Sequence, residues 1–218
     1  MPLELRQVEK GDFADIAKLD QIACPNEGVV HIIRQLQRDE GMDVSTSFAQ
    51  WIATGTEHHA GTFWKVVDSD TNEVVSVAKF TFQYHEGEAY QDTPTPPVEG
   101  ETPLPKRLIE FFAWLNKISD EYAKDHFKGK PHAYLMYLCT HPGHRKRGAA
   151  GMLLEKGTQL ADMAGLDMYL QASLMGVPLY RKFGFEVVRV GEIDLSQWGG
   201  DKLDSRTFMK RKTRGVRQ

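Results

Sequence analysis

The feature of the sequence that most constrains its fold is a basic, glycine-containing turn between a strand-like and a helix-like segment. Residues 133–140, AYLMYLCT, are apolar and partly aromatic, as in a buried strand. They lead into HPGHRKRG and then into AAGMLLEKG, which favours a helix. This arrangement aims unpaired backbone N–H groups at an anion, usually a phosphate. On this segment alone, an ordinary connection with solvent-facing charges explains the pattern equally well.

The amino-acid composition limits which binding partners and which cellular location we expect for the protein. The chain has 218 residues, 41% hydrophobic and 26% charged, which predicts a single globular domain over residues 1–218 carrying one insertion. Its net charge of −3 and the lack of a broad basic face predict no binding to nucleic acid. No apolar run approaches the ~20 residues of a membrane span, and the charged N-terminus is unlike a signal peptide. Two distant cysteines and scattered histidines predict no metal site and a reducing, cytoplasmic location.

Hydrophobic periodicity along the rest of the chain gives the order of the expected elements. Helices are expected at residues 12–23, 29–39, 108–122, 149–164 and 176–184, and strands at residues 63–67, 74–82, 133–140, 167–173, after 184 and at 205–212. Two helices, a hairpin, an insertion and then alternating strands and helices predict an α/β or α+β fold. Such a fold is a sheet of mixed strand direction covered by helices.

The segment 84–131 interrupts the sheet pattern. Its first part, HEGEAYQDTPTPPVEGETPLP, is acidic and rich in proline, and the amphipathic helix expected at residues 108–122 carries many aromatic residues. The simpler interpretation is that this aromatic stripe packs on the core. A long loop and helix inserted between two strands of a sheet also often forms a lid or one wall of a binding site.

Two motifs together carry a family resemblance. The turn, RKRGAA at residues 145–150, matches Arg/Gln-x-x-Gly-x-Gly/Ala, and LYRKFGF at residues 179–185 matches Leu-Tyr-x-x-x-Gly-Phe. In this order, with a helix and a strand between them, they resemble the GNAT acetyltransferases, which move an acetyl group from acetyl-CoA to an amine. The match covers residues 133–188, and residues 173–180 look like fungal members. The resemblance implies a mostly antiparallel twisted sheet with a splayed central strand pair.

The resemblance also implies which residues bind acetyl-CoA. The turn would hold the pyrophosphate, because small residues let backbone N–H groups approach it and arginines can add charge-assisted bonds. The strand before the turn would pair its backbone with the pantetheine arm. Ser173 stands where many members have Asn, and Gly176 where they have Ala. The expected cofactor-binding residues are Leu138, Cys139, Thr140, Arg145, Lys146, Arg147, Gly148, Ala149, Ala150 and Ser173.

Tyr180 matches the family tyrosine that is assigned as the general acid near the thioester sulfur. A thiol with a pKa of ~8.5 leaves more readily when the forming thiolate is protonated, and a phenol can donate that proton. The alternative is that Tyr180 is a core aromatic whose hydroxyl is satisfied within the protein. No motif marks the general base, and the candidates at the insertion and strand ends are His85, Glu88, Glu110 and His132.

The expected function is therefore an acetyl-CoA-dependent N-acetyltransferase acting on a primary amine of a small molecule. The acetyl group would move directly in a ternary complex, and the protein would be a monomer or a homodimer. Two alternatives remain, a protein or peptide N-acetyltransferase of the same fold and a non-catalytic CoA-binding module. The long insertion favours a small, closed acceptor pocket, and Tyr180 favours catalysis.

Overall fold

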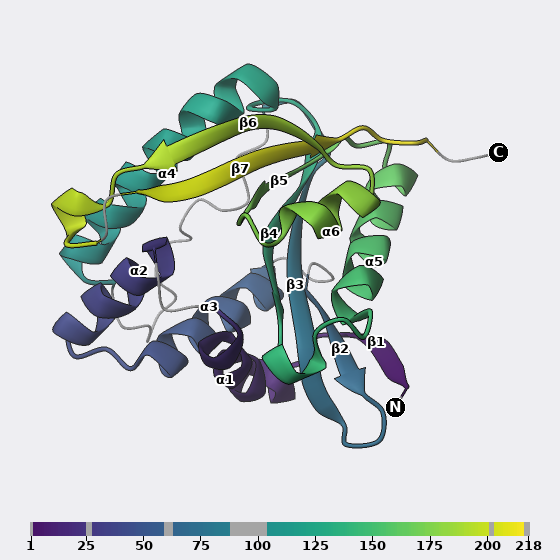
Figure 1. Ribbon diagram of the computed structural model, residues 1–218, viewed down its shortest axis with the longest axis horizontal. Helices are drawn as coiled ribbons and strands as arrows, with labels where there is room; N and C mark the ends of the chain where they lie inside the picture. The colour runs from purple at the N-terminus through teal and green to yellow at the C-terminus, as the bar shows by residue number, and fades with distance from the viewer. Residues whose placement is uncertain (1, 25–27, 59–62, 88–103, 201–202, 216–218) are drawn as a thin grey trace.

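The sheet is the framework that places every expected site residue. The computed structural model describes residues 2–24, 28–58, 63–87, 104–200 and 203–215. Its strands are β1 (Leu3–Gln7), β2 (Phe63–Asp68), β3 (Glu73–Gln83), β4 (His132–Thr140), β5 (Met168–Ala172), β6 (Glu186–Ile193) and β7 (Asp204–Arg211). They form one sheet in the order β1-β2-β3-β4-β5-β7-β6 (Figure 1). Only the β4–β5 pair is parallel, which confirms the expected mixed, mostly antiparallel sheet.

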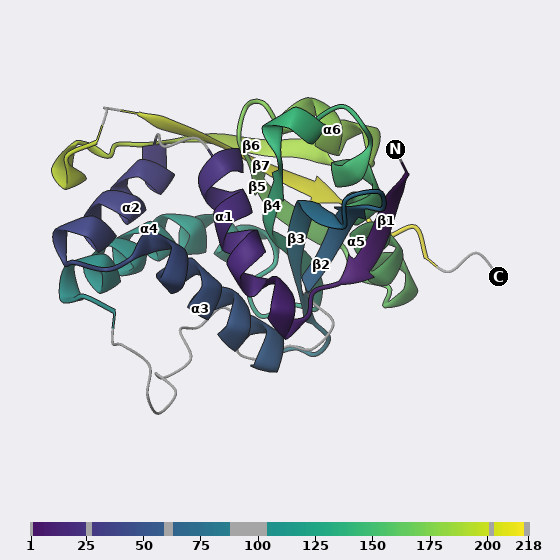
Figure 2. The ribbon, with the colours of Figure 1, turned by 90° about the horizontal axis from the view of Figure 1, so that it is seen from below.

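Helices cover both faces of this sheet. They are α1 (Phe13–Ala23), α2 (Gly28–Asp39), α3 (Val44–His58), α4 (Lys106–His126), α5 (Ala149–Met163) and α6 (Val177–Lys182). Helices α5 and α6 lie on one side of the sheet and α1 to α4 on the other (Figures 1 and 2). Leu153 and Leu154 of α5 are fully buried against Phe80 of β3 and Leu170 of β5, so the largest core lies beneath α5.

The sequence patterns did not predict two elements of the structure, β1 and α3. The α3 sequence, VSTSFAQWIATGTEH, is rich in residues of modest helix propensity. Its apolar side chains nevertheless pack on the sheet, and Trp51 meets the ring of Phe63 edge-on at a centroid distance of 5.7 Å. The carboxylate of Asp43 also accepts a hydrogen bond from the Thr46 N–H at 2.7 Å, next to the start of the helix. Tertiary packing and this contact therefore outweigh the weak intrinsic propensity.

Residues 84–131 connect β3 to β4, and α4 occupies the last part of this connection. Phe111 of α4 meets Trp198 edge-on at 5.0 Å, and Tyr122 lies 4.0 Å from Phe208 of β7, both measured between ring centroids. The aromatic stripe therefore packs into the core against β7 and the β6–β7 connection. Residues 88–103, which include Glu88 and most of the proline-rich stretch, lie outside the described residues.

The two central strands separate partway along β4. Their pairing covers only residues 133–135 of β4 and 168–170 of β5. Just beyond, the register with β3 steps from Phe80↔Leu135 to Lys79↔Tyr137, so Met136 is an extra residue in β4. A bulge of this kind bends a strand, and here it coincides with the point where β4 leaves β5. In the described part of the chain, no strand pairs with residues 136–140 on the side facing β5, which confirms the splayed pair.

Candidate functional site

The turn between β4 and α5 has the backbone conformation of an anion-binding site. Two of its residues have left-handed backbones, Lys146 with φ 62° and Gly148 with φ 96°. Gly148 is the N-cap of α5 and provides no capping side chain, so the first N–H groups of the helix lack intrahelical partners. Turns with alternating backbone handedness form concave groups of N–H donors that bind anions. The turn is therefore suited to a phosphate group through its backbone.

The basic side chains of this turn are partly engaged with the protein. Arg145 donates a hydrogen bond from Nη2 to the backbone oxygen of Ala23, at the end of α1, at 3.1 Å. Arg147 donates a hydrogen bond from Nη1 to the Oδ2 atom of Asp68 at 2.9 Å, and the Asp68 side chain is fully buried. The side chain of Lys146 is exposed. Arg147, which the sequence suggested as a phosphate ligand, thus already has a carboxylate partner, and no sequence motif pointed to Asp68.

The end of β4 offers its backbone to a ligand. The Leu138 side chain packs into the core beneath α5, and Cys139 packs on the opposite side with α1 and α3. On β3, Ser76 donates a hydrogen bond from Oγ to the backbone oxygen of Cys139 at 2.7 Å and lies 2.8 Å from Thr140 Oγ1. Because these side chains are occupied by the core, the available groups are the backbone amides along the edge that faces β5.

Tyr180 lies on α6 with its ring buried and 8% of the residue exposed. The ring packs edge-on against Phe185 at a centroid distance of 6.0 Å, in the core beneath α5. Burial raises the pKa of the Tyr180 hydroxyl to about 12, so the hydroxyl is protonated at neutral pH. Within the described part of the chain this hydroxyl forms no hydrogen bond. The hydroxyl oxygen is not closed off from solvent, because the fully buried side-chain atoms that lack a partner in the described structure are those of Tyr122 and Trp198.

Gly176 makes room for the Tyr180 ring. A Cβ atom at position 176 would lie only 2.8 Å from Cε2 of Tyr180, closer than real side chains allow. The departure from the family pattern, Gly instead of Ala, therefore accompanies the close packing of this ring. Ser173, the other departure, is exposed directly after β5, and its backbone oxygen accepts a hydrogen bond from the Gly176 N–H at 2.9 Å.

The described candidates for the general base lie at different places. His132 is 2% exposed at the start of β4, where burial lowers its pKa. It pairs with Gln83, the last residue of β3, and His85 follows two residues later. Both histidines therefore sit at the end of β4 that remains paired with β5, opposite the turn. Glu110 is exposed on α4, with its Oε1 atom 3.9 Å from Lys106 Nζ.

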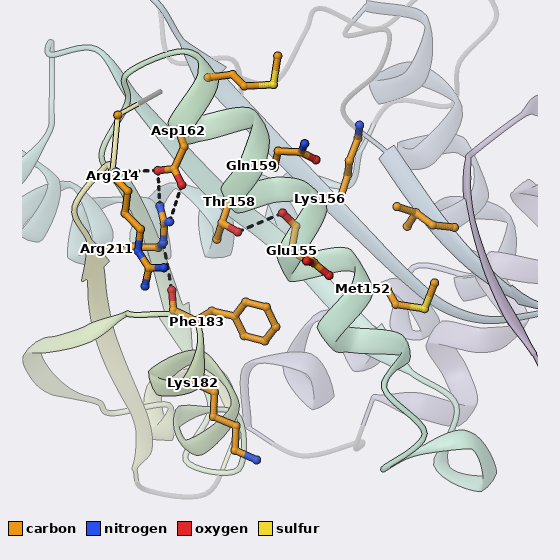
Figure 3. A pocket seen from close by; sticks show the side chains of 13 residues that line it. Met152, Glu155, Lys156, Thr158, Gln159, Asp162, Lys182, Phe183, Arg211 and Arg214 are labelled. Carbon is orange, nitrogen blue, oxygen red and sulfur yellow. Dashed lines mark hydrogen bonds and ion pairs between the residues drawn. The ribbon is translucent and has the colours of Figure 1, made fainter. Parts of the chain in front are cut away.

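A pocket of about 680 Å³ runs along α5, beginning within its first turn (Figure 3). Met152 and Phe183 supply apolar and aromatic surface, and Lys182 at the end of α6 supplies a positive charge. At the far end Arg211 forms two hydrogen bonds to Asp162, at 2.8 and 2.7 Å, so its charge is already paired. The Lys182 ammonium forms no ion pair with another described residue and is exposed.

Two further properties concern the described ranges as a whole. Over residues 2–24, 28–58, 63–87, 104–200 and 203–215, no helix combines the length and apolar character needed to cross a membrane. In the same ranges, no three His, Cys, Asp or Glu side chains gather in a group that could hold a metal ion.

Comparison with known families decides the identity. Residues 109–187, from within α4 to the start of β6, match the family described as the acetyltransferase (GNAT) domain. The chain carries a GNAT acetyltransferase domain. The matched segment contains β4, the turn, α5, β5 and α6, which are the elements that carry both sequence motifs. The resemblance and the enzyme class expected from the sequence, an acyltransferase, are confirmed.

Solved structures agree with the GNAT fold at low sequence identity. Mosquito arylalkylamine N-acetyltransferase like 5b is 16% identical with a TM-score of 0.64, covering 97% of this chain and all of that one. The C-terminal condensation domain of Ebony, in complex with β-alanyl-dopamine, is 8% identical at 0.66 over 98% and 100%. Chaetomium thermophilum Naa20, bound to a bisubstrate analogue, is 13% identical at 0.58 over 96% and 86%. No curated protein sequence matches the chain.

Proposed function

We propose that this GNAT protein transfers the acetyl group of acetyl-CoA to a primary amine of a small molecule, directly in a ternary complex. The observation that carries the proposal is the Tyr180 hydroxyl, which is protonated, has no hydrogen-bond partner in the described structure and, unlike the Tyr122 hydroxyl, is not closed off from solvent. The Tyr180 ring is held in the core while its hydroxyl stays within reach of a ligand, as a proton donor to a bound substrate requires.

The residues present fit acetyl-CoA, which supplies a reactive acetyl thioester when bound. The open edge of β4 at residues 136–140 offers backbone amides to the amide groups of the pantetheine arm. The uncapped start of α5 at Gly148 offers N–H donors to the diphosphate. In the pocket that begins at Met152, the Phe183 ring is available to the adenosine and the Lys182 ammonium group to its phosphate. These three features follow one another from the splayed strands to α6.

Tyr180 would act by donating a hydrogen bond, and then a proton, toward the sulfur as the thiolate leaves. Its pKa of about 12 keeps the proton on the phenol until negative charge develops nearby. A hydrogen bond that strengthens as charge develops stabilises the transition state more than the ground state. The amine must arrive neutral or lose a proton to water or to a carboxylate or imidazole of the chain.

A small acceptor is favoured by the elements on the side of the sheet opposite α5. There α2, α4 and the β6–β7 connection share an aromatic core that includes Phe111 and Trp198. Helix α4, in the connection between β3 and β4, adds structure to this side, as expected of a wall around a small pocket. An arylalkylamine acceptor is named for one protein of similar fold, and a peptide acceptor remains the alternative.

The function is tested by turnover on a panel of acceptors. The panel contains arylalkylamines, aliphatic amines and short peptides with free N-termini, and the readouts are CoA thiol release and the mass of the product. We expect acetyl-CoA-dependent acetylation of at least one small amine. Turnover only on peptides would support the protein-acetylating alternative. Tight binding of acetyl-CoA with no turnover on any acceptor would support a non-catalytic CoA-binding module.

The position of the adenosine end is tested by Lys182→Ala. If Lys182 contacts the 3′-phosphate, this variant should bind CoA about tenfold more weakly, since a charge-assisted bond is lost. It should bind dephospho-CoA as well as the wild type does, because that ligand lacks the phosphate. Calorimetry with both ligands makes the comparison. Equal losses for both ligands, or for neither, would contradict the assignment of the pocket to the adenosine phosphate.

A further inference from the structure

A buried carboxylate lies behind the basic turn, on a strand that carries no motif. Asp68 is the last residue of β2 and is completely buried. Its Oδ1 atom accepts a hydrogen bond from the Asp70 N–H at 3.1 Å, and its backbone oxygen accepts one from the Asn72 N–H at 2.7 Å. These bonds fix Asp68 in the hairpin between β2 and β3. The other carboxylate oxygen, Oδ2, accepts the hydrogen bond from Arg147 at 2.9 Å.

On the turn itself, Arg147 stands between the two left-handed residues, Lys146 and Gly148. A left-handed backbone is unfavourable for lysine, so surrounding contacts must hold it in place. Arg147 provides such a contact through Asp68, and its NH1 atom also lies 2.5 Å from Nδ1 of His144. The Nε2 atom of His144 is 3.7 Å from Glu73, the first residue of β3. The β2–β3 hairpin thus supports the turn from behind at two neighbouring side chains.

The carboxylate is charged, which gives the contact its strength. Burial alone would raise the pKa of Asp68, but the hydrogen bonds from Arg147 and Asp70 and the charges of Arg147 and His144 lower it below its usual value. Asp68 is therefore ionised at neutral pH, and its bond to Arg147 is a charge-assisted one. Removing Arg147 would leave the buried Asp68 charge without its main compensating partner.

We propose that Asp68 is a positioning residue for acetyl-CoA, which holds Arg147 from behind and thereby keeps the backbone N–H groups of the turn in the conformation that binds the diphosphate. The inference rests on the proposed function, since it assumes that acetyl-CoA binds at this turn. Arg147 then acts on the shape of the turn rather than as a phosphate ligand. Its motif position is explained by a partner 79 residues earlier in the sequence.

The test measures CoA affinity by calorimetry at several salt concentrations, together with melting temperature. Asp68→Asn keeps the size of the side chain and an acceptor for the Asp70 N–H, and removes the charge that holds Arg147. We expect the Kd for CoA to rise about tenfold, as loss of an outer positioning group commonly causes. The salt dependence of binding should stay unchanged, because no charge that touches the phosphates is lost. Arg147→Gln should give the same result, and the double variant no further loss.

The matched control is Asp12→Asn. Asp12, just before α1, forms an ion pair at 2.5 Å with Lys65, which lies on β2 like Asp68. Both side chains of this pair are largely buried. This variant should lower the melting temperature and leave the Kd for CoA unchanged. A general loss of stability in β2 is thereby separated from an effect on the turn.

Several outcomes would overturn the inference. If Asp68→Asn binds CoA as tightly as the wild type, or more tightly, the carboxylate does not position the turn. If Arg147→Gln weakens CoA binding and also reduces its dependence on salt, then Arg147 is a direct phosphate ligand and the inference is wrong. This test does not require that Asp68→Asn folds. A wild-type protein that fails to bind CoA at all would instead refute the proposed function, and the inference with it.

Discussion

Replacing Tyr180 with phenylalanine should lower kcat about 100-fold, the usual contribution of a general acid, while leaving the Kd for acetyl-CoA nearly unchanged. The variant removes a single oxygen, and the ring keeps its contact with Phe185 and its place next to Gly176. Because the hydroxyl forms no hydrogen bond within the described structure, its removal should not lower the melting temperature. Steady-state kinetics, calorimetry and thermal melting of the same sample measure the three quantities.

Tyr169→Phe is the structural control for this variant. Tyr169 lies on β5 and is buried, and its hydroxyl donates a hydrogen bond to the backbone oxygen of His126 at 3.4 Å. Its loss should reduce stability by ~1 kcal/mol and leave kcat within a few-fold of the wild type. If Tyr180→Phe behaves like this control, with chemistry shown to limit turnover, then Tyr180 takes no part in the reaction.

The pH profile gives a second readout for Tyr180. Its hydroxyl donates only while protonated, and burial raises its pKa to about 12, so ionisation removes the donor only near that pH. The wild type should therefore show no loss of kcat from this group between pH 8 and pH 10. A descending limb of kcat near pH 10 that disappears in Tyr180→Phe would show that the tyrosine ionises at its ordinary value.

Gly148→Val should raise the Kd for acetyl-CoA by tenfold or more. Gly148 has φ 96°, a left-handed conformation that costs a side-chain-bearing residue ~1–3 kcal/mol, and most of all a β-branched one. The valine backbone should relax away from this conformation and displace the N–H groups at the start of α5. A Cβ atom at this position would meet nothing within 4 Å, so the expected effect comes from the backbone conformation rather than from a clash at Cβ.

Gly165→Val is the matched control at the other end of the same helix. Gly165 follows the end of α5 with φ 69°, and a Cβ atom there also meets nothing within 4 Å. The two variants should lose similar stability through backbone strain, yet only Gly148→Val should weaken acetyl-CoA binding. Equal Kd values for the two variants and the wild type would refute the phosphate-binding role of the turn.

The sequence predicted the parts of the site whose conformation depends on local chemistry. A strand, a glycine turn and a helix follow from neighbouring residues, so the position of Gly148 before α5 could be read directly. The distance between this turn and the tyrosine motif added specificity, because short glycine patterns alone are common. The expected helix and strand between the two motifs are present as α5 and β5.

The parts that escaped prediction depend on contacts between distant segments. Asp68 ends an ordinary strand, and only the fold brings it to Arg147. The bulge at Met136 has no local signature, although it marks where β4 and β5 diverge. Helix α3 contains weak helix formers and is held by packing on the sheet. In each case long-range packing decides the structure, and a single sequence does not record which distant residues meet.

Because the pairing between β4 and β5 is short, the stability of the sheet should depend on whether a ligand is bound at the open edge of β4. Only three residue pairs join the half formed by β1 to β4 to the half formed by β5 to β7. A molecule that forms hydrogen bonds with the backbone of residues 136–140 replaces the strand pairing that β5 does not provide there. Such a molecule binds only the folded state. At 100 times its Kd, such a ligand adds about 2.7 kcal/mol to the free energy of unfolding. If acetyl-CoA binds as proposed, its depletion should shorten the protein's lifetime against proteolysis, and the abundance of the protein should follow the supply of acetyl-CoA.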